Sequence, residues 1–239
     1  MATPTTGPIR RFRNRFPRDR RRALTFSFNE IESMGKRAAR GAGLSWGLAE
    51  EAGKAARWLT EHGEPGADLL AKRLGDIDRL AYADLAPVDQ DGVWRAPRGQ
   101  LCPLIAGPML SDQAAAITAG DELVLGAIAD PVFLAPYAAA IAKQTGKAIV
   151  LRWEGAVLTV TADGLAFEGR RDQRDVAVAE TVTCALAATT PMVSPACIQR
   201  QPVDAEAWRR LDAFAQRTFA PATEESRLAG AGAGLDDND

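Results

Sequence analysis

The chain has 239 residues, of which 46% are hydrophobic, and a formal net charge of −2. This composition supports a sizeable buried core and excludes a chain that is disordered throughout. The single histidine excludes histidine-based metal sites and argues against serine–histidine–aspartate catalysis. Three widely spaced cysteines without a CxxC pair fit a reducing cytoplasm, and no apolar run is long enough for a membrane span.

Residues 1–23 form an arginine-rich segment that contains three prolines. They hold eight arginines and one acid, so the remaining chain carries 29 minus 8, or 21, basic residues against 31 minus 1, or 30, acidic ones, a net charge of −9. We expect a disordered tail, although this composition also resembles a transit peptide or a nucleic-acid-binding arm. The acidic remainder, 24–239, is expected to be one domain and argues against nucleic acid as its main partner.

Two helices joined by a glycine bend are predicted between Ser27 and Gly63. Ser27 and Glu30 fit a capping box at the start of the first helix, which the Gly-Ala-Gly bend at 41–43 would end. Ser45 would cap the second helix. Many small residues in that helix favour close packing against a neighbouring element.

The bend between these helices is also a candidate anion site. Lys36 and Arg40 would supply positive charge, while Gly41 and Gly43 would expose free backbone N–H groups at the start of the second helix. We therefore consider these four residues candidate substrate-binding residues for an anionic small molecule, with close helix packing as the alternative.

The rest of the chain alternates between helical and strand-like patterns. Helices are predicted at 66–74, from 111–112 through 114–116, at 133–143 and at 204–218. Strands are predicted at 122–129, 147–153, 157–161, 165–167 and 180–189, with an edge strand or an irregular buried segment at 101–109 and a solvated charged loop at 170–175. Asp-Gly at 163–164 is expected to form a hairpin turn that needs a positive φ at Gly164.

This order predicts an α+β fold. An N-terminal helix pair would be followed by a mixed or antiparallel sheet with a β-meander and one crossover helix. A C-terminal helix capped by Asp204 would complete the domain.

The last 20 residues combine acids with a run of glycines. Such a composition is typical of a solubilising chain end. Alternatively, the segment closes a site, with Glu224 as general base and the substrate contacted by Ser226, Arg227, Gly230 and Gly232. In that case we expect it to bind at the 41–43 bend. The glycine run lacks the lysine of a P-loop, which argues against a nucleotide.

Cys102 lies beside Pro103, and Cys197 lies in the stretch SPACIQRQP, both in irregular segments. Two thiols can act as acid and base in cofactor-independent epimerisation if their pKa values are lowered. Buried, inert thiols are the alternative interpretation. No motif indicates a cofactor, so the cofactor is left unassigned.

Three stretches carry a resemblance to a known family: NEIESMGKRAARGAGLSWGLAEEAGKAARWL at 29–59, LCPLIAGPMLSD at 101–112 and RTFAPATEESRLAGAGAGLDDND at 217–239. Together they resemble an uncharacterised bacterial family, a domain of unknown function. The resemblance spans about 24–239 and implies that both end segments belong to the domain, while the arginine-rich tail is peripheral. It implies no activity and no catalytic residue.

Two functional hypotheses follow. The first is a cytoplasmic enzyme, or a subunit of one, that acts on an anionic small molecule. The second is a non-catalytic domain that binds a protein partner, or a second copy of itself, through alanine-rich helix faces. A deep pocket between distant segments would favour the first, and an empty, shallow surface would favour the second.

Overall fold

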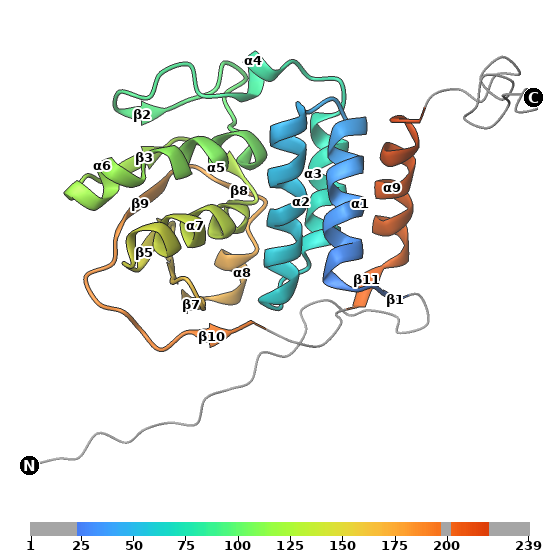
Figure 1. The fold of residues 1–239 in the computed structure, drawn as a ribbon. Helices are drawn as coiled ribbons and strands as arrows, with labels where there is room; N and C mark the ends of the chain where they lie inside the picture. The colour runs from blue at the N-terminus through green and yellow to red at the C-terminus, as the bar shows by residue number, and fades with distance from the viewer. Residues whose placement is uncertain (1–22, 197–201, 220–239) are drawn as a thin grey trace, which may run out of the picture.

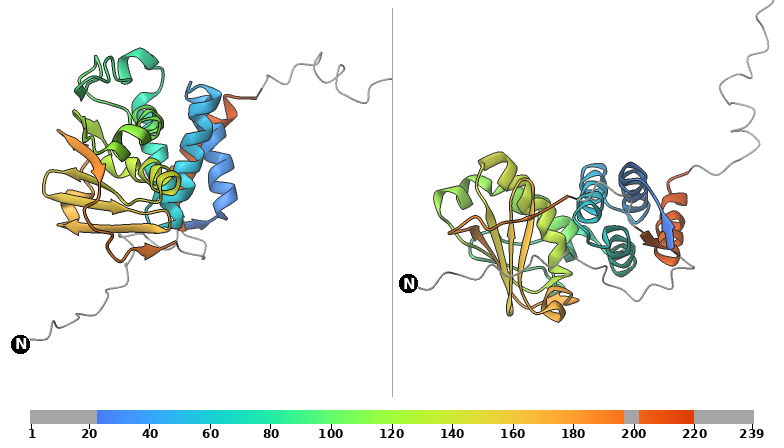
Figure 2. Two further views of the ribbon diagram at one scale, coloured as in Figure 1. Left: turned by 60° about the vertical axis from the view of Figure 1, so that its left-hand side comes forward. Right: turned by 90° about the horizontal axis from the view of Figure 1, so that it is seen from below.

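The computed structural model describes residues 23–196 and 202–219. Four helices stand side by side in one part of the molecule, and the view from below separates them from the sheet (Figures 1 and 2). They are α1 (Phe28–Gly41), α2 (Trp46–Glu61), α3 (Gly66–Ile77) and α9 (Ala205–Gln216). The short strands β1 (Ala23–Thr25) and β11 (Pro202–Asp204) pair antiparallel below them.

The predicted helix pair is confirmed, including its caps. The Ser27 Oγ accepts from the Glu30 N–H, and the Glu30 carboxylate accepts from the Ser27 N–H at 2.7 Å. The Ser45 side chain accepts from the Leu48 N–H and caps α2. A Cβ on Gly53 would lie 2.6 Å from the Glu32 carbonyl oxygen, so the small residues of α2 let the two helices pack closely.

The seven-stranded sheet is mixed. Its strand order is β10-β7-β6-β5-β9-β3-β2, and every pair is antiparallel except β2–β3. The strands are β2 (Val93–Trp94), β3 (Leu123–Leu125), β5 (Ile149–Trp153), β6 (Ala156–Val160), β7 (Gly164–Gly169), β9 (Val182–Leu186) and β10 (Ser194–Pro195). A second two-stranded sheet pairs β4 (Ile128–Ala129) with β8 (Val178–Ala179).

The β-meander and the crossover helix are both confirmed. Consecutive strands β5, β6 and β7 are neighbours in the sheet. Strands β3 and β5 both run antiparallel to β9, so they are parallel to each other and need a crossover. The 3-10 turn η2 (Pro131–Leu134) and helix α7 (Ala135–Thr145) supply it, and Gly146 ends α7 with φ +70°.

The prediction of an edge strand or an irregular buried segment at 101–109 is wrong. The region forms helix α5 (Pro103–Asp112), followed by α6 (Ala114–Ala119), which begins after Gln113 instead of at the predicted Ser111–Asp112 cap. Pro103 occupies the first turn, where its missing N–H costs no hydrogen bond. Burial on nearly all sides removes the polar stripe that would have identified a helix.

Two further predictions are wrong. The charged segment 170–175 contains the helical turn α8 (Arg171–Arg174), and Arg174 is buried in an ion pair with Glu64. The hairpin predicted around 163–164 does form between β6 and β7, but the expected positive φ at Gly164 is absent, because Gly164 is already the first residue of β7. The left-handed backbone lies instead at Gly155, with φ +69°.

Two hydrophobic clusters fill the described part of the molecule. One lies among α1, α2, α3 and α9 and extends to α5, η2 and α7. The other lies between the sheet and α5, α6 and α7. Trp58 and Met109 pack against both clusters. Helix α2 also contacts α5 and α7, which joins the helical layer to the rest of the fold. No helix among the described residues has the length and apolar character to cross a membrane.

Candidate functional site

The predicted cations on α1 are engaged within the helix pair. Lys36 Nζ lies 3.1 Å from Glu50 Oε2 of α2. An Arg40 nitrogen donates to the Leu44 carbonyl at 2.9 Å, and its guanidinium lies 5.1 Å from the centre of the Trp46 ring. Lys36 therefore joins α1 to α2, and Arg40 binds the backbone just after the bend. The role of both side chains in substrate binding stays a prediction.

The backbone N–H groups of the bend also have partners. Ala42 donates to Ala38, Gly43 to Arg40 and Leu44 to Ala39, at 2.9–3.1 Å. These bonds satisfy the end of α1, so the three N–H groups are not available to an anion in this conformation.

The two glycines of the bend have different surroundings. A Cβ on Gly41 would lie 1.8 Å from the Phe214 carbonyl oxygen, so this glycine lets α9 approach α1. Gly43 has φ +103° and open space around its Cβ position. Of the four substrate-binding candidates in the described residues, only Gly43 lines a cavity identified in this region.

Cys102 precedes α5 and is 1% exposed. Burial raises its pKa to about 11, so the thiol is protonated at neutral pH. This environment argues against acid–base catalysis by Cys102 and fits the alternative of an inert thiol. Cys197, Glu224, Ser226, Arg227, Gly230 and Gly232 lie outside the described residues, and their roles stay predictions.

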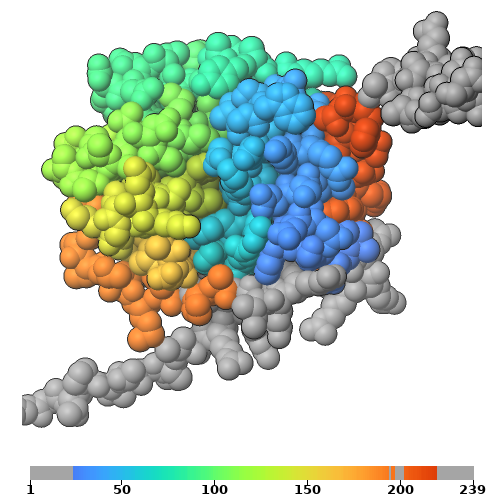
Figure 3. Space-filling model, viewed as in Figure 1, coloured from blue at the N-terminus to red at the C-terminus, as the bar shows by residue number. Residues whose placement is uncertain are grey.

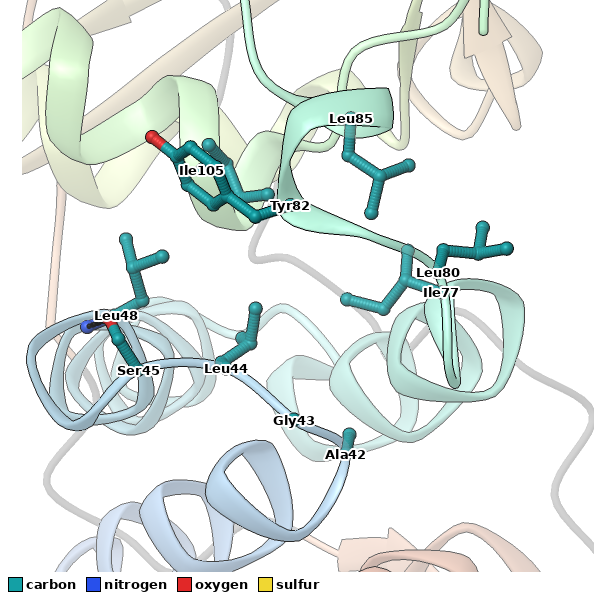
Figure 4. Close-up of a pocket in the computed structure, with 10 residues that line it drawn as sticks. All are labelled: Ala42, Gly43, Leu44, Ser45, Leu48, Ile77, Leu80, Tyr82, Leu85 and Ile105. Atoms are coloured by element: carbon teal, nitrogen blue, oxygen red, sulfur yellow. Dashed lines mark hydrogen bonds between the residues drawn. The ribbon is translucent and has the colours of Figure 1, made fainter.

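A cleft lies between the helix bend and the segment that follows α3. Its larger part, which we call the apolar cavity, has a volume of about 460 Å³. Leu44 and Leu48 approach it from the helix pair, and Tyr82 and Leu85 of α4 (Tyr82–Leu85) approach from the opposite wall (Figure 4). It is lined by Ala42, Gly43, Leu44, Ser45, Leu48, Ile77, Leu80, Tyr82, Leu85 and Ile105.

A second, polar cavity of about 360 Å³ adjoins the first. The two share Ile77, Leu80 and Leu85, so one cleft changes from apolar to polar along its length. The polar cavity is lined by Arg73, Asp76, Ile77, Leu80, Leu85, Arg98, Gln100, Leu101 and Cys102. In the space-filling view the α4 segment forms the upper edge of the molecule above the start of α2 (Figure 3).

An ion cluster around the buried Arg73 and Asp130 adjoins the polar cavity. Asp130 Oδ1 lies 2.6 Å from Lys72 Nζ, and its Oδ2 lies 3.2 Å from a terminal nitrogen of Arg73. Arg73 also pairs with Asp76. Asp130 has φ +41°, a left-handed conformation that costs a non-glycine residue about 1–3 kcal/mol. The cluster therefore holds α3 against the β4–η2 junction in a strained arrangement.

Sequence reasoning missed this cluster. Lys72 and Asp130 are 58 residues apart, and each looked like an ordinary surface residue beside a helix or a turn. The Asp130-Pro131 pair was the only local signal, and it indicated a turn without indicating burial.

The single histidine of the chain, His62, lines neither cavity. Its ring stacks on Trp58 at 3.8 Å, and its Nδ1 lies 2.7 Å from the Trp58 carbonyl oxygen. Burial lowers its pKa below the ordinary histidine value. Within 23–196 and 202–219, no group of three or more histidine, cysteine or acidic side chains is placed to hold a metal ion.

Comparison with known families matches the N-terminal part of the described chain. Residues 26–102 match the family described as "Protein of unknown function (DUF3726)". This confirms the resemblance to a domain of unknown function over α1, α2, α3, α4 and β2, a shorter span than the expected 24–239. Comparisons with curated proteins and with solved structures found no match.

The matched span contains most of the cleft. Every residue that lines the polar cavity lies within 26–102, as do all those that line the apolar cavity except Ile105. The cleft thus belongs mainly to the part of the chain that shares the family's pattern.

Proposed function

We propose that the cleft binds a small molecule with an apolar body and an anionic group. The observation that carries this proposal is the position of Arg98 at the polar end of the cleft. Its side chain is exposed and forms no ion pair with the described residues, whereas Arg73, in the same cavity, is already paired with two aspartates.

The chemistry of the two cavities supports this ligand class. A guanidinium offers paired donors that match a carboxylate or phosphate. The adjoining apolar cavity would remove the rest of the ligand from water, and its volume falls within the range of about 300–1,000 Å³ that is usual for small-molecule sites. The ligand would therefore place its anion at Arg98 and its apolar body between Leu48, Tyr82 and Leu85.

The alternative of partner binding through alanine-rich faces receives less support. The alanines of α2 at 49, 52, 55 and 56 are at most 1% exposed, because they pack in the protein's own core. We further propose a bacterial, cytoplasmic protein, which is supported by the resemblance and by the free thiols of Cys102 and Cys184. We assign no reaction to the cleft.

The proposal is tested with a panel of aromatic and short-chain carboxylates and phosphates, each paired with its neutral amide or alcohol. Thermal shift selects binders, and calorimetry measures Kd for the wild type, Arg98→Gln and the control Arg95→Gln. A hydrogen bond to a charged group contributes about 1.5–3 kcal/mol, so Arg98→Gln should weaken binding about 10–100-fold. Arg95 is exposed nearby but does not line the cleft, so its substitution should have little effect.

The outcome that refutes the proposal is equal affinity of Arg98→Gln and wild type for every binder found. Equal binding of the anionic and neutral members of each pair would refute it as well.

A further inference from the structure

The last described residues bring the chain to the entrance of the cleft. A Cβ on Gly41 would meet the Phe214 carbonyl, so the end of α9 lies against the end of α1. Arg217 binds Asp78, the residue after α3, through two contacts of 2.6 and 3.1 Å. The end of the described chain therefore lies close to the ends of α1 and α3. The residues that follow these two helices, within 42–44 and 80–85, line the apolar cavity.

The surface around the cleft leaves several large apolar side chains uncovered. Tyr82, which lines the apolar cavity, is 55% exposed, and Trp46, the residue after the lining Ser45, is 63% exposed. Phe219, at the end of the described chain, is 56% exposed. The exposed ring of Tyr82 therefore leaves apolar surface at the cavity that another segment can cover.

The chain continues for 20 residues beyond Phe219, as 220–239. Fully extended, this segment would reach about 66–72 Å, so every part of the cleft is within its range. Its acids number five and its bases one, a net charge of −4. Arg79 is exposed beside the cleft and Arg98 within it, while Asp76 of the same cavity is paired with Arg73. The two arginines therefore offer cationic partners to the acids of the segment.

The order of residues in this segment matches the order of the two cavities. Leu235 is followed directly by Asp236 and Asp237. Adjacent Cα atoms are 3.8 Å apart, so an apolar side chain and an acid can enter neighbouring cavities at once. The glycines at 230, 232 and 234 add no side chains that would obstruct a close approach.

We propose that the C-terminal segment 220–239 binds in the cleft of its own chain. Leu235 fills the apolar cavity, and the following aspartates bind at Arg98. The segment then presents the same pattern as the ligand proposed above, an apolar group followed by an anion, and competes with it. Only this competition rests on the proposed function, since the binding of the segment itself does not require a ligand.

The experiment compares hydrogen exchange in the full-length wild type, Leu235→Ser and Arg98→Gln, without added ligand. Peptides covering 76–88 and 230–239 report on the cleft and on the segment. In both variants these peptides should exchange at least tenfold faster than in the wild type. Ala231→Ser and Arg95→Gln are the matched controls and should exchange as the wild type does. Leu235 lies outside the described residues, so Leu235→Ser removes no contact described above, and a change in exchange at 76–88 reports on the cleft.

Two results would overturn the inference. In the first, the backbone amides of 230–239 exchange at the unprotected rate in the wild type, and peptide 76–88 exchanges at the same rate in Leu235→Ser as in the wild type. In the second, the protection disappears on dilution, because the occupant would then be the segment of a second copy.

The Kd of a ligand from the panel separates this inference from the proposed function. Tighter ligand binding by Leu235→Ser than by wild type supports competition. Protection of the segment without any ligand binding in any variant refutes the proposed function alone. Ligand binding with unprotected exchange throughout refutes the inference alone.

Discussion

Replacement of Gly41 by alanine tests whether the glycine bend is built for helix packing. The added Cβ would lie 1.8 Å from the Phe214 carbonyl oxygen. To reach a separation of 3.0 Å, α9 would have to move by the difference, 1.2 Å. This contact is with a backbone atom, so no side-chain rotation relieves it. Overpacking of this kind costs about 1–3 kcal/mol.

The expected loss of stability is measurable by thermal and urea unfolding. In a chain of this size each kcal/mol changes the Tm by about 2–4 °C, so Gly41→Ala should melt about 2–12 °C below the wild type. The control is Gly75→Ala on the exposed side of α3, where a Cβ would meet nothing within 4 Å. That change should stabilise the protein by about 0.5–1 kcal/mol, because alanine favours a helix more than glycine does.

The two variants together can refute the packing argument. If Gly41→Ala is as stable as the wild type while Gly75→Ala behaves as expected, Gly41 does not hold α9 against α1. Faster hydrogen exchange confined to α9 in Gly41→Ala would instead support the argument, since it shows that the clash separates this helix locally.

Three other changes test individual features of the fold. Asp130→Asn removes the buried counter-charge of Arg73, which is also the partner of Lys72, and should lower the unfolding free energy by about 3 kcal/mol. Asp76→Asn, at a half-exposed carboxylate, should cost less than about 1 kcal/mol, and equal urea midpoints for the two variants would contradict this. His62 has a lowered pKa, so its stabilising effect is complete above the ordinary histidine pKa and is lost as pH falls through the folded value. NMR titration of this single imidazole should show the low pKa, and His62→Gln should reduce the loss of Tm between pH 7 and 5; a normal pKa would contradict the burial argument. Gly155→Val should cost about 2 kcal/mol or more in thermal unfolding, because Gly155 has φ +69° and a new Cβ would lie 2.0 Å from a side chain of α8; an unchanged Tm would show that the turn adapts.

Local signals account for the parts of the fold that could be predicted. The capping box of α1 and the cap of α9 each lie within a few neighbouring residues. Their geometry is set by short-range hydrogen bonds and backbone preferences. The helical spacing of Ala207, Leu211, Phe214 and Ala215 likewise agrees with the buried face of α9.

Long-range contacts account for what could not be predicted. Helix α5 looks like a strand because tertiary burial, not an amphipathic pattern, stabilises it. Arg174 looked solvated because its partner Glu64 belongs to the turn between α2 and α3. The cleft was missed for the same reason, since its walls come from the helix bend, from α4 and from Ile105.

The pairing of β1 with β11 has a consequence for synthesis of the chain. Thr25 opposite Pro202 closes a loop of 176 residues, 26–201, at an entropic cost of about 4–5 kcal/mol. Helix α1 therefore emerges from the ribosome long before α9. At about 5–20 residues per second, the side of α1 that α9 will cover waits roughly 10–35 s for its partner. During that time α1, α2 and α3 lack the helix that covers their apolar side. A chaperone that binds apolar helix faces would bind the chain at this surface.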